Sequence, residues 1–164
     1  MCLHNPWIQA VLQYMIKFDR YNERILQILL EDGRISNTEL AERVGLSPSA
    51  TLRRVQELER SGVIAGYRAQ LNPAALGVGF TAYIHVGLSD HAKASQRAFE
   101  ESIVGAPEVR ECHNITGAYE YLLRVEVQDL AAYKVFHTDI LGTLPQVSSI
   151  TTYVVMESPK DERA

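Results

Sequence analysis

The first half of the chain has the apolar spacing of three short helices. Hydrophobic residues recur there every three or four positions, which places them on one face of a helix. The predicted helices run from Asp19 to Asp32-Gly33, from Ser36 to Gly45 and from Ser47-Pro48 to Ser61-Gly62. Three such helices with brief connections are typical of a helix-turn-helix domain.

The residues between these helices support the same prediction. Ser36 and Glu39 have the spacing of a capping box, in which the hydroxyl satisfies an orphan backbone N–H and the glutamate reaches back. Gly45 supplies the left-handed conformation of a tight turn, and Ser47-Pro48 is a typical helix start. We expect the inner face of the third helix to consist of Leu52, Val55 and Leu58.

From residue 80 the pattern changes to that of a sheet with two helices. Apolar and polar residues alternate over 80–88, as in a strand with one buried face. A helix is predicted over 92–104, a hairpin of strands over 109–116 and 119–127, a helix from Asp129 to Ile140, and a last strand over 147–156. The predicted fold class is therefore α+β, a winged-type helix-turn-helix followed by a βαββαβ ferredoxin-like (ACT-like) domain.

These elements divide the chain into five segments. We expect an N-terminal extension over 1–17, the helix-turn-helix over 18–62, a strand and linker over 63–79, the second domain over 80–157 and a tail over 158–164. Two interpretations of the extension stay open. Either the natural start is Met15 and residues 1–14 lie upstream of it, or the segment forms an amphipathic helix with Trp7, Ile8, Val11, Leu12 and Met15 on its apolar side.

Composition excludes several classes of protein. With 46% hydrophobic and 22% charged residues, the 164-residue chain has enough apolar material for a core and is not disordered. No apolar run approaches the roughly 20 residues of a membrane helix, and no signal peptide is expected. The two cysteines, Cys2 and Cys112, form no metal-binding or disulfide pattern, which fits a reducing cytosol.

Charge differs in sign between the halves of the chain. The net charge is −4, but residues 1–70 hold nine Lys/Arg against eight Asp/Glu, whereas residues 71–164 hold seven against twelve. A basic first half is expected if that half alone meets a polyanion.

The outer face of the third helix has the residues of a DNA-reading surface. If its inner face is as predicted, Ser49, Arg53, Gln56 and Arg60 point outward and Arg54 lies on the flank. The forked guanidinium of Arg53 fits the acceptors of guanine in the major groove. We expect Ser49 and Arg53 near bases, Gln56 on the same DNA-binding face, and Arg34, Arg54, Arg60 and the amides near Ser47 at phosphates. The alternative is a solvated face with i,i+4 pairs such as Arg53–Glu57; the capping and turn signals favour DNA.

The predicted sheet leaves one face uncovered, because both helices would cover the other. Tyr83 and His85 would lie on the open face, which predicts a homo-oligomer, either a dimer or an assembly of dimers. His85 and His113 occupy different strands, and we interpret them as interface or ligand-contact residues. No nucleophile motif, phosphate loop or metal-ligand spacing appears, so no catalytic residue, cofactor or metal is predicted.

Two sets of motifs resemble the Lrp/AsnC (feast/famine) family of transcriptional regulators, and especially its leucine-responsive branch. In the first half these are Ile35–Ser49, Arg53-Arg54-Val55 and Leu58–Ile64; in the second half they are Glu111-Cys112-His113, Thr116–Leu123 and Thr152–Glu157. The resemblance runs from about Phe18 to about Pro159 and implies a cytoplasmic, nucleoid-associated regulator that binds double-stranded DNA and an amino acid or a related metabolite.

The resemblance also implies an effector site on the predicted hairpin. Its residues would be Thr116, Gly117, Ala118, Tyr119 and Glu120, with Thr151 and Thr152 from the last strand. Glu120 stands where the family usually has aspartate, and we expect its carboxylate to be available for a cationic group. A basic amino acid and a small neutral or branched one both stay open as effectors. Two other functions share this layout: a sirohaem-decarboxylase-like enzyme that uses His85, His113 and Arg124, and an architectural DNA-binding protein without an effector.

Overall fold

The computed structural model describes residues 19–161, which divide near residue 70 into two compact units. Both interpretations of the N-terminal extension lie outside the described residues, as do the last three residues of the predicted tail. No helix within 19–161 is long and apolar enough to cross a membrane.

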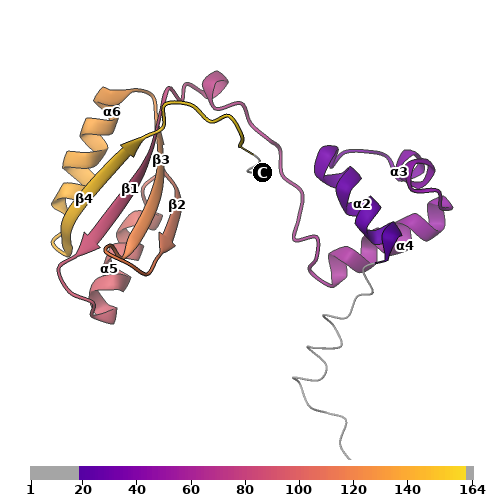
Figure 1. The fold of residues 1–164 in the computed structure, drawn as a ribbon, viewed down its shortest axis with the longest axis horizontal. Helices are drawn as coiled ribbons and strands as arrows, with labels where there is room; N and C mark the ends of the chain where they lie inside the picture. The colour runs from indigo at the N-terminus through magenta and orange to yellow at the C-terminus, as the bar shows by residue number, and fades with distance from the viewer. Residues whose placement is uncertain (1–18, 162–164) are drawn as a thin grey trace, which may run out of the picture. The chain divides into compact units, whose positions relative to one another are not determined.

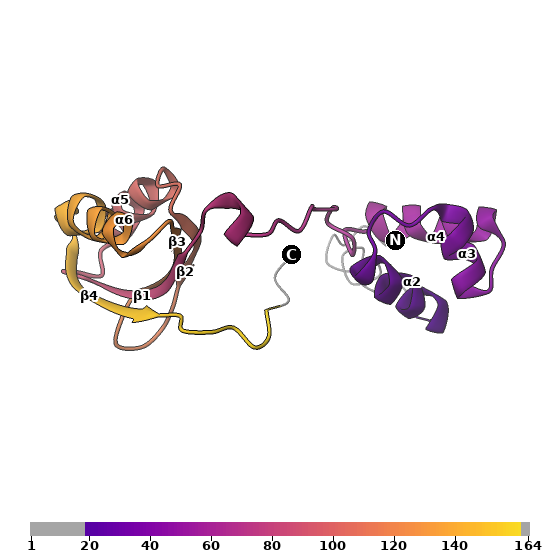
Figure 2. The ribbon, with the colours of Figure 1, turned by 90° about the horizontal axis from the view of Figure 1, so that it is seen from above.

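The first unit consists of the three predicted helices. They are α2 (Arg20–Glu31), α3 (Asn37–Val44) and α4 (Pro48–Arg60), shown in Figures 1 and 2. Their small shared core is formed by Ile25, Ile28, Leu40 and Leu58, which are at most 2% exposed. This confirms the predicted helix-turn-helix.

The predicted cap residues set the ends of these helices. The Asp19 carboxylate accepts hydrogen bonds from the N–H groups of Tyr21 and Asn22 at the start of α2. Ser36 caps α3 through the N–H of Glu39, and Gly45 ends that helix with φ 76°. Ser47 caps α4 through the N–H of Ala50. A polar cap at each start and a left-handed glycine at the turn explain why such short helices end where they do.

The inner face of α4 differs from the prediction at one position. Thr51 is fully buried, whereas Leu52 is 46% exposed. Thr51, Val55 and Leu58 follow the i, i+4, i+7 spacing of one helical face, and the predicted set beginning at Leu52 fits a helix almost as well. The hydrophobicity of Leu52 favoured the wrong register, so the prediction that Leu52 is an inner residue is wrong.

The segment between the two units, residues 61–79, contains no strand. The strand expected within 63–79 therefore does not form. A short 3-10 helix, η1 (Ala74–Leu76), follows Pro73 and ends at Gly77 with φ 81°.

The second unit has the predicted βαββαβ order. Its elements are β1 (Phe80–Leu88), α5 (Lys93–Val104), β2 (Val109–Asn114), β3 (Tyr121–Val127), α6 (Leu130–Val135) with the helical turns η2 (Phe136–Ile140) and η3 (Leu141–Thr143), and β4 (Val147–Val154). The antiparallel sheet has the strand order β2-β3-β1-β4, so β2 and β4 are its edges. The first hairpin strand ends two residues sooner than predicted and the second begins two residues later, so six residues, 115–120, connect them. The last strand ends at Val154 rather than Met156.

One face of this sheet carries the core. The helices α5 and α6 both lie on the same side of the sheet, as Figure 2 shows. Ile84 and Val86 of β1 and Leu123 of β3 pack there against Phe99 and Phe136, all at most 1% exposed. No helix of the unit covers the opposite face, which we call the open face; it carries Tyr83 and His85, as predicted.

Candidate DNA-binding and ligand-binding sites

The exposed face of α4 carries most of the predicted DNA contacts. Ser49, Arg53, Gln56 and Arg60 are all exposed on this helix, and Arg34 is exposed in the turn before α3. The start of α4 is fixed in two ways, because Ser47 caps it and the Asn37 side chain donates a hydrogen bond to the Pro48 carbonyl at 2.9 Å. The cross-link to Asn37 of α3 holds the turn between the two helices.

Arg54 does not lie free on the flank of α4. Its guanidinium forms an ion pair with Asp19 at 2.9 Å and donates a hydrogen bond to Asn22 at 2.9 Å. It also lies 5.4 Å from the centre of the Tyr21 ring. The N–H of Asn22 and the Arg54 guanidinium lower the pKa of Asp19. The structure therefore corrects the expectation of a free phosphate-binding arginine: Arg54 ties α4 to the start of α2.

The two outward arginines of α4 differ in their partners. Arg60 pairs with Glu57 at 2.6 Å, an i,i+3 contact in place of the i,i+4 pairs considered from the sequence. Among the described residues Arg53 forms no ion pair or hydrogen bond. A guanidinium without an internal partner keeps all its donors for an external acceptor.

The loop 115–120 exposes backbone at the tip of the predicted hairpin. Thr116, Gly117 and Ala118 are exposed, whereas Tyr119 and Glu120 are half-buried. Gly117 has φ 148°, a conformation that residues with a side chain rarely adopt. Apart from its chain neighbours, no described residue lies within 4 Å of the space that a Cβ of Gly117 would fill, so a ligand such as a carboxylate can approach this backbone closely.

Tyr119 and Thr151 meet beside this loop on the open face. Their hydroxyl groups are 3.0 Å apart, and the Tyr119 ring stacks on His85 with 5.0 Å between ring centres. Tyr153 approaches the other side of His85 edge-on at 5.3 Å. The result is a half-buried aromatic and hydroxyl cluster next to the accessible backbone.

Glu120 has partners within the chain, contrary to the expectation that it is available for a cationic ligand. Its Oε2 accepts a hydrogen bond from the Leu88 N–H at 2.7 Å, and its Oε1 lies 3.2 Å from His91 Nδ1. The Glu120 side chain is only 16% exposed. At the neighbouring Gly87 a Cβ would collide with the Ser149 hydroxyl, so β4 approaches β1 closely beside this contact. Glu120 thus ties the loop 115–120 to the end of β1 and to the segment that follows it.

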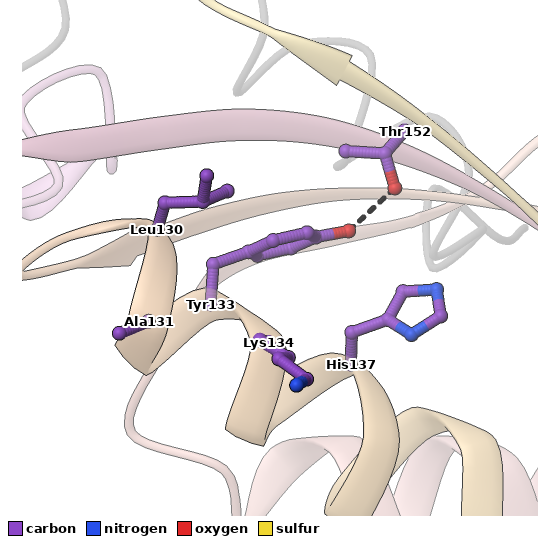
Figure 3. Close-up of a pocket in the computed structure, with 6 residues that line it drawn as sticks. All are labelled: Leu130, Ala131, Tyr133, Lys134, His137 and Thr152. Carbon is purple, nitrogen blue, oxygen red and sulfur yellow. Dashed lines mark hydrogen bonds between the residues drawn. The ribbon is translucent and has the colours of Figure 1, made fainter.

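Thr151 and Thr152 lie on opposite faces of the sheet. In register Thr151 pairs with His85 of the open face, whereas Thr152 pairs with the core residue Ile84. The Thr152 hydroxyl meets the Tyr133 hydroxyl at 2.5 Å on the helix side, as Figure 3 shows. The two threonines therefore cannot line the same site of one subunit, and the predicted effector set loses Thr152.

The histidines and arginine of the enzymatic alternative are not assembled into a site. His85 and His113 both pair with Leu122, so a strand separates them. His113 lies 3.4 Å from Glu111, and Arg124 binds Glu111 at 2.7 Å and also Glu126. Within residues 19–161 no group of three side chains has the geometry of a metal site.

Several contacts could not be found from sequence spacing. The partners of Arg54 are 35 and 32 residues away, and the partner of Glu120 at Leu88 is 32 residues away. Such polar pairs leave no local period. The one available signal was Gly87, a glycine inside a strand, which indicates close approach of another group.

Comparison with known proteins assigns both units to described domain families. Residues 18–65 match a winged helix-turn-helix DNA-binding domain, and residues 81–164 match the Lrp/AsnC ligand-binding domain.

Full-length relatives share this arrangement. The chain is 42% identical over 142 residues to the leucine-responsive regulatory protein of Escherichia coli K12, which covers 87% of both chains. A transcriptional regulator from Neisseria meningitidis, solved in complex with L-Met, superimposes with a TM-score of 0.83 at 37% identity, covering 87% of this chain and 92% of that one. An AsnC family regulator from Agrobacterium tumefaciens gives 0.82 at 33% identity, covering 87% and 93%.

Proposed function

Because this chain belongs to the Lrp/AsnC family of DNA-binding transcriptional regulators, we propose that α4 reads its operator and that an amino acid at the loop 115–120 controls its affinity for DNA. The observation that carries the DNA contact is the exposed face of α4, where Arg53 has no ion pair or hydrogen bond with any residue of 19–161. The N-terminal part of such a helix enters the major groove, where Ser49, Arg53 and Gln56 reach base edges.

The remaining predicted contacts serve the DNA backbone. Arg34, Arg60 and the N–H groups that follow Ser47 bind phosphates, which supply affinity without sequence preference. Arg54 acts indirectly, because its contacts with Asp19 and Asn22 hold α4 in place. Regulation of this kind takes place on the nucleoid in the cytoplasm.

The effector is a small or branched amino acid with an uncharged side chain. A relative is named for its response to leucine, and a structural neighbour was solved with L-Met. The accessible backbone around Gly117 suits the ligand carboxylate, and Tyr119 with Thr151 offers hydroxyl groups. Because both oxygens of Glu120 have internal partners, a basic effector side chain finds no free carboxylate there.

The working form is an even-numbered oligomer formed through the open face. Tyr153 is 54% exposed on this face, and no other element within the described unit covers it. Pairing two subunits supplies two α4 helices, which bind half-sites about one DNA turn apart. An amino acid that favours one assembly over another then changes DNA affinity.

The decisive experiment selects duplexes from a random pool and measures their affinity by fluorescence anisotropy, with and without each amino acid. We expect one sequence class to be enriched, and at least one uncharged amino acid to change its dissociation constant. Failure to enrich any sequence contradicts the α4 proposal. Enrichment with no response to any amino acid contradicts the effector proposal and supports an architectural protein.

A further inference from the structure

A groove on the helix side of the second unit lies apart from the loop 115–120. It has a volume of about 750 Å³ and is lined by Leu130, Ala131, Tyr133, Lys134, His137 and Thr152. Figure 3 shows these residues around the Tyr133 ring, between α6 and the edge strand β4. We propose that this groove is a second small-molecule site, which binds an organic monocarboxylate with an apolar body.

The floor and one wall of the groove are apolar and fixed. The Tyr133 ring is 8% exposed and stacks on Phe80, with 5.0 Å between ring centres and 28° between planes. Its hydroxyl is held by Thr152, so the ring cannot swing into the groove. Leu130 is 65% exposed and stands beside it. A fixed aromatic floor next to an uncovered leucine favours a flat or branched apolar body.

Apart from the paired Tyr133 and Thr152 hydroxyls, the polar side chains at the groove are Lys134 and His137. Lys134 forms no ion pair or hydrogen bond with any residue of the described range, and the His137 ring lies 5.9 Å from the Tyr133 ring between centres. No acidic residue lines the groove. Residues 71–164 carry twelve Asp/Glu against seven Lys/Arg, so a cationic groove runs against the charge of this half of the chain. Charge complementarity therefore favours an anion.

The same lining disfavours an amino acid. The ammonium group of an amino acid needs a carboxylate or several free acceptors, and the two hydroxyls here already bind each other. A monocarboxylate without an amine, such as a 2-oxo acid or an arylacetic acid, satisfies Lys134 and leaves no buried charge unpaired. A volume of about 750 Å³ is within the usual range of small-ligand pockets, roughly 300–1,000 Å³.

This site is separable from the proposed effector site. Thr152 lines the groove, whereas its neighbour Thr151 binds Tyr119 on the open face. Adjacent residues of a strand project to opposite faces, so a change in one site need not alter the other.

The test is calorimetric titration of the full-length protein with phenylacetate. Phenethylamine, which has the same ring and the opposite charge, is the matched ligand control, and L-phenylalanine tests the effect of an added amine. We expect phenylacetate to bind and phenethylamine not to bind, with L-phenylalanine weaker than phenylacetate. Equal heats for all three, or no heat from phenylacetate at millimolar concentration, would overturn the proposal.

Variants then locate the binding. Lys134→Met should lower the affinity for phenylacetate by about tenfold or more, the loss expected for one charge-assisted contact. Lys93→Met, the same change on the exposed start of α5, should have no effect. Ala131→Phe should fill the groove and abolish binding, whereas Ala94→Phe on α5 should not. Gly117→Val should leave phenylacetate binding unchanged.

Two further results would contradict the proposal. Phenylacetate binding that survives both Lys134→Met and Ala131→Phe places the ligand elsewhere. Light scattering that shows a smaller assembly for Ala131→Phe but not for Ala94→Phe identifies the groove as a contact between subunits instead.

Discussion

Arg54, in the middle of α4, binds Asp19, the residue that caps α2, with 2.9 Å between guanidinium and carboxylate. One carboxylate thus both starts the first helix and holds the proposed DNA-reading helix. A small three-helix core leaves much of the relative orientation of its helices to such contacts. This contact therefore links the stability of the first unit to the presentation of Arg53.

The first prediction concerns the pH dependence of this contact. The pKa of Asp19 is lowered by the Asn22 N–H and by Arg54, so the unfolded state takes up the proton first as pH falls. The stability that Asp19 contributes is present above its unfolded pKa, near 4, and is lost as pH falls through the folded pKa. We expect the urea midpoint of the first unit to fall below pH 4 in the wild type and to fall less in Asp19→Asn. Asparagine keeps the cap without the charge, so an identical pH profile for both proteins would contradict the assignment.

The second prediction separates base reading from phosphate binding. Arg53→Ala should weaken binding to the selected operator by about 1–3 kcal/mol and relax preference at one base position. Arg60→Ala should weaken binding to all duplexes by a similar factor. It should also reduce the slope of log K against log salt concentration by about one. Neither change should move the melting temperature much, because both side chains are exposed. If Arg53→Ala lowers the affinity for all duplexes equally, Arg53 binds phosphate rather than a base.

Much of the fold was predictable because it rests on local signals. Caps such as Asp19, Ser36 and Ser47 fix helix ends within a few residues, and alternation over 80–88 fixes which side of β1 is buried. The error at Leu52 has the same origin. Two helical faces one residue apart fit the pattern, and only tertiary packing selects the one with Thr51 inside.

The sites were less predictable because they depend on long-range pairing. The exposure of Arg53 follows from helix geometry, but the ion pair between Arg54 and Asp19 does not. Strand alternation alone separates Thr151 from Thr152, and applying it to the last strand would have excluded Thr152 from the effector set. The partners of Glu120 are Leu88 at the end of β1 and His91 in the loop after it, and no local pattern connects these residues with 115–120.

The third prediction concerns the effector loop. Gly117→Val should abolish the response to the amino acid, because φ 148° strains a β-branched residue and its side chain blocks approach to the backbone. Apart from its chain neighbours, no residue within 19–161 lies within 4 Å of the added Cβ, so the second unit should still fold and basal DNA binding should persist. Gly105→Val, at a helix end with φ −79°, is the control and should respond normally. A normal response in Gly117→Val places the effector elsewhere.

The fourth prediction tests whether Glu120 ties the loop to the chain after β1. The Leu88 N–H donates to Glu120 at 2.7 Å, and removal of this acceptor leaves that N–H without its carboxylate partner. Glu120→Ala should therefore speed hydrogen exchange of the Leu88 amide by about tenfold or more, the equivalent of one hydrogen bond to a charged group. Glu120→Gln keeps an acceptor oxygen and should retain most of the protection, while Glu101→Ala on the exposed side of α5 should change nothing. The Glu120 carboxylate also contacts His91, so Glu120→Ala removes both side-chain contacts through which Glu120 holds the loop 115–120. Amino-acid binding at this loop should therefore be altered, even though Glu120 touches no ligand in our proposal. Unchanged Leu88 exchange in Glu120→Ala would show that the carboxylate is free in solution, and a basic effector would again fit the site.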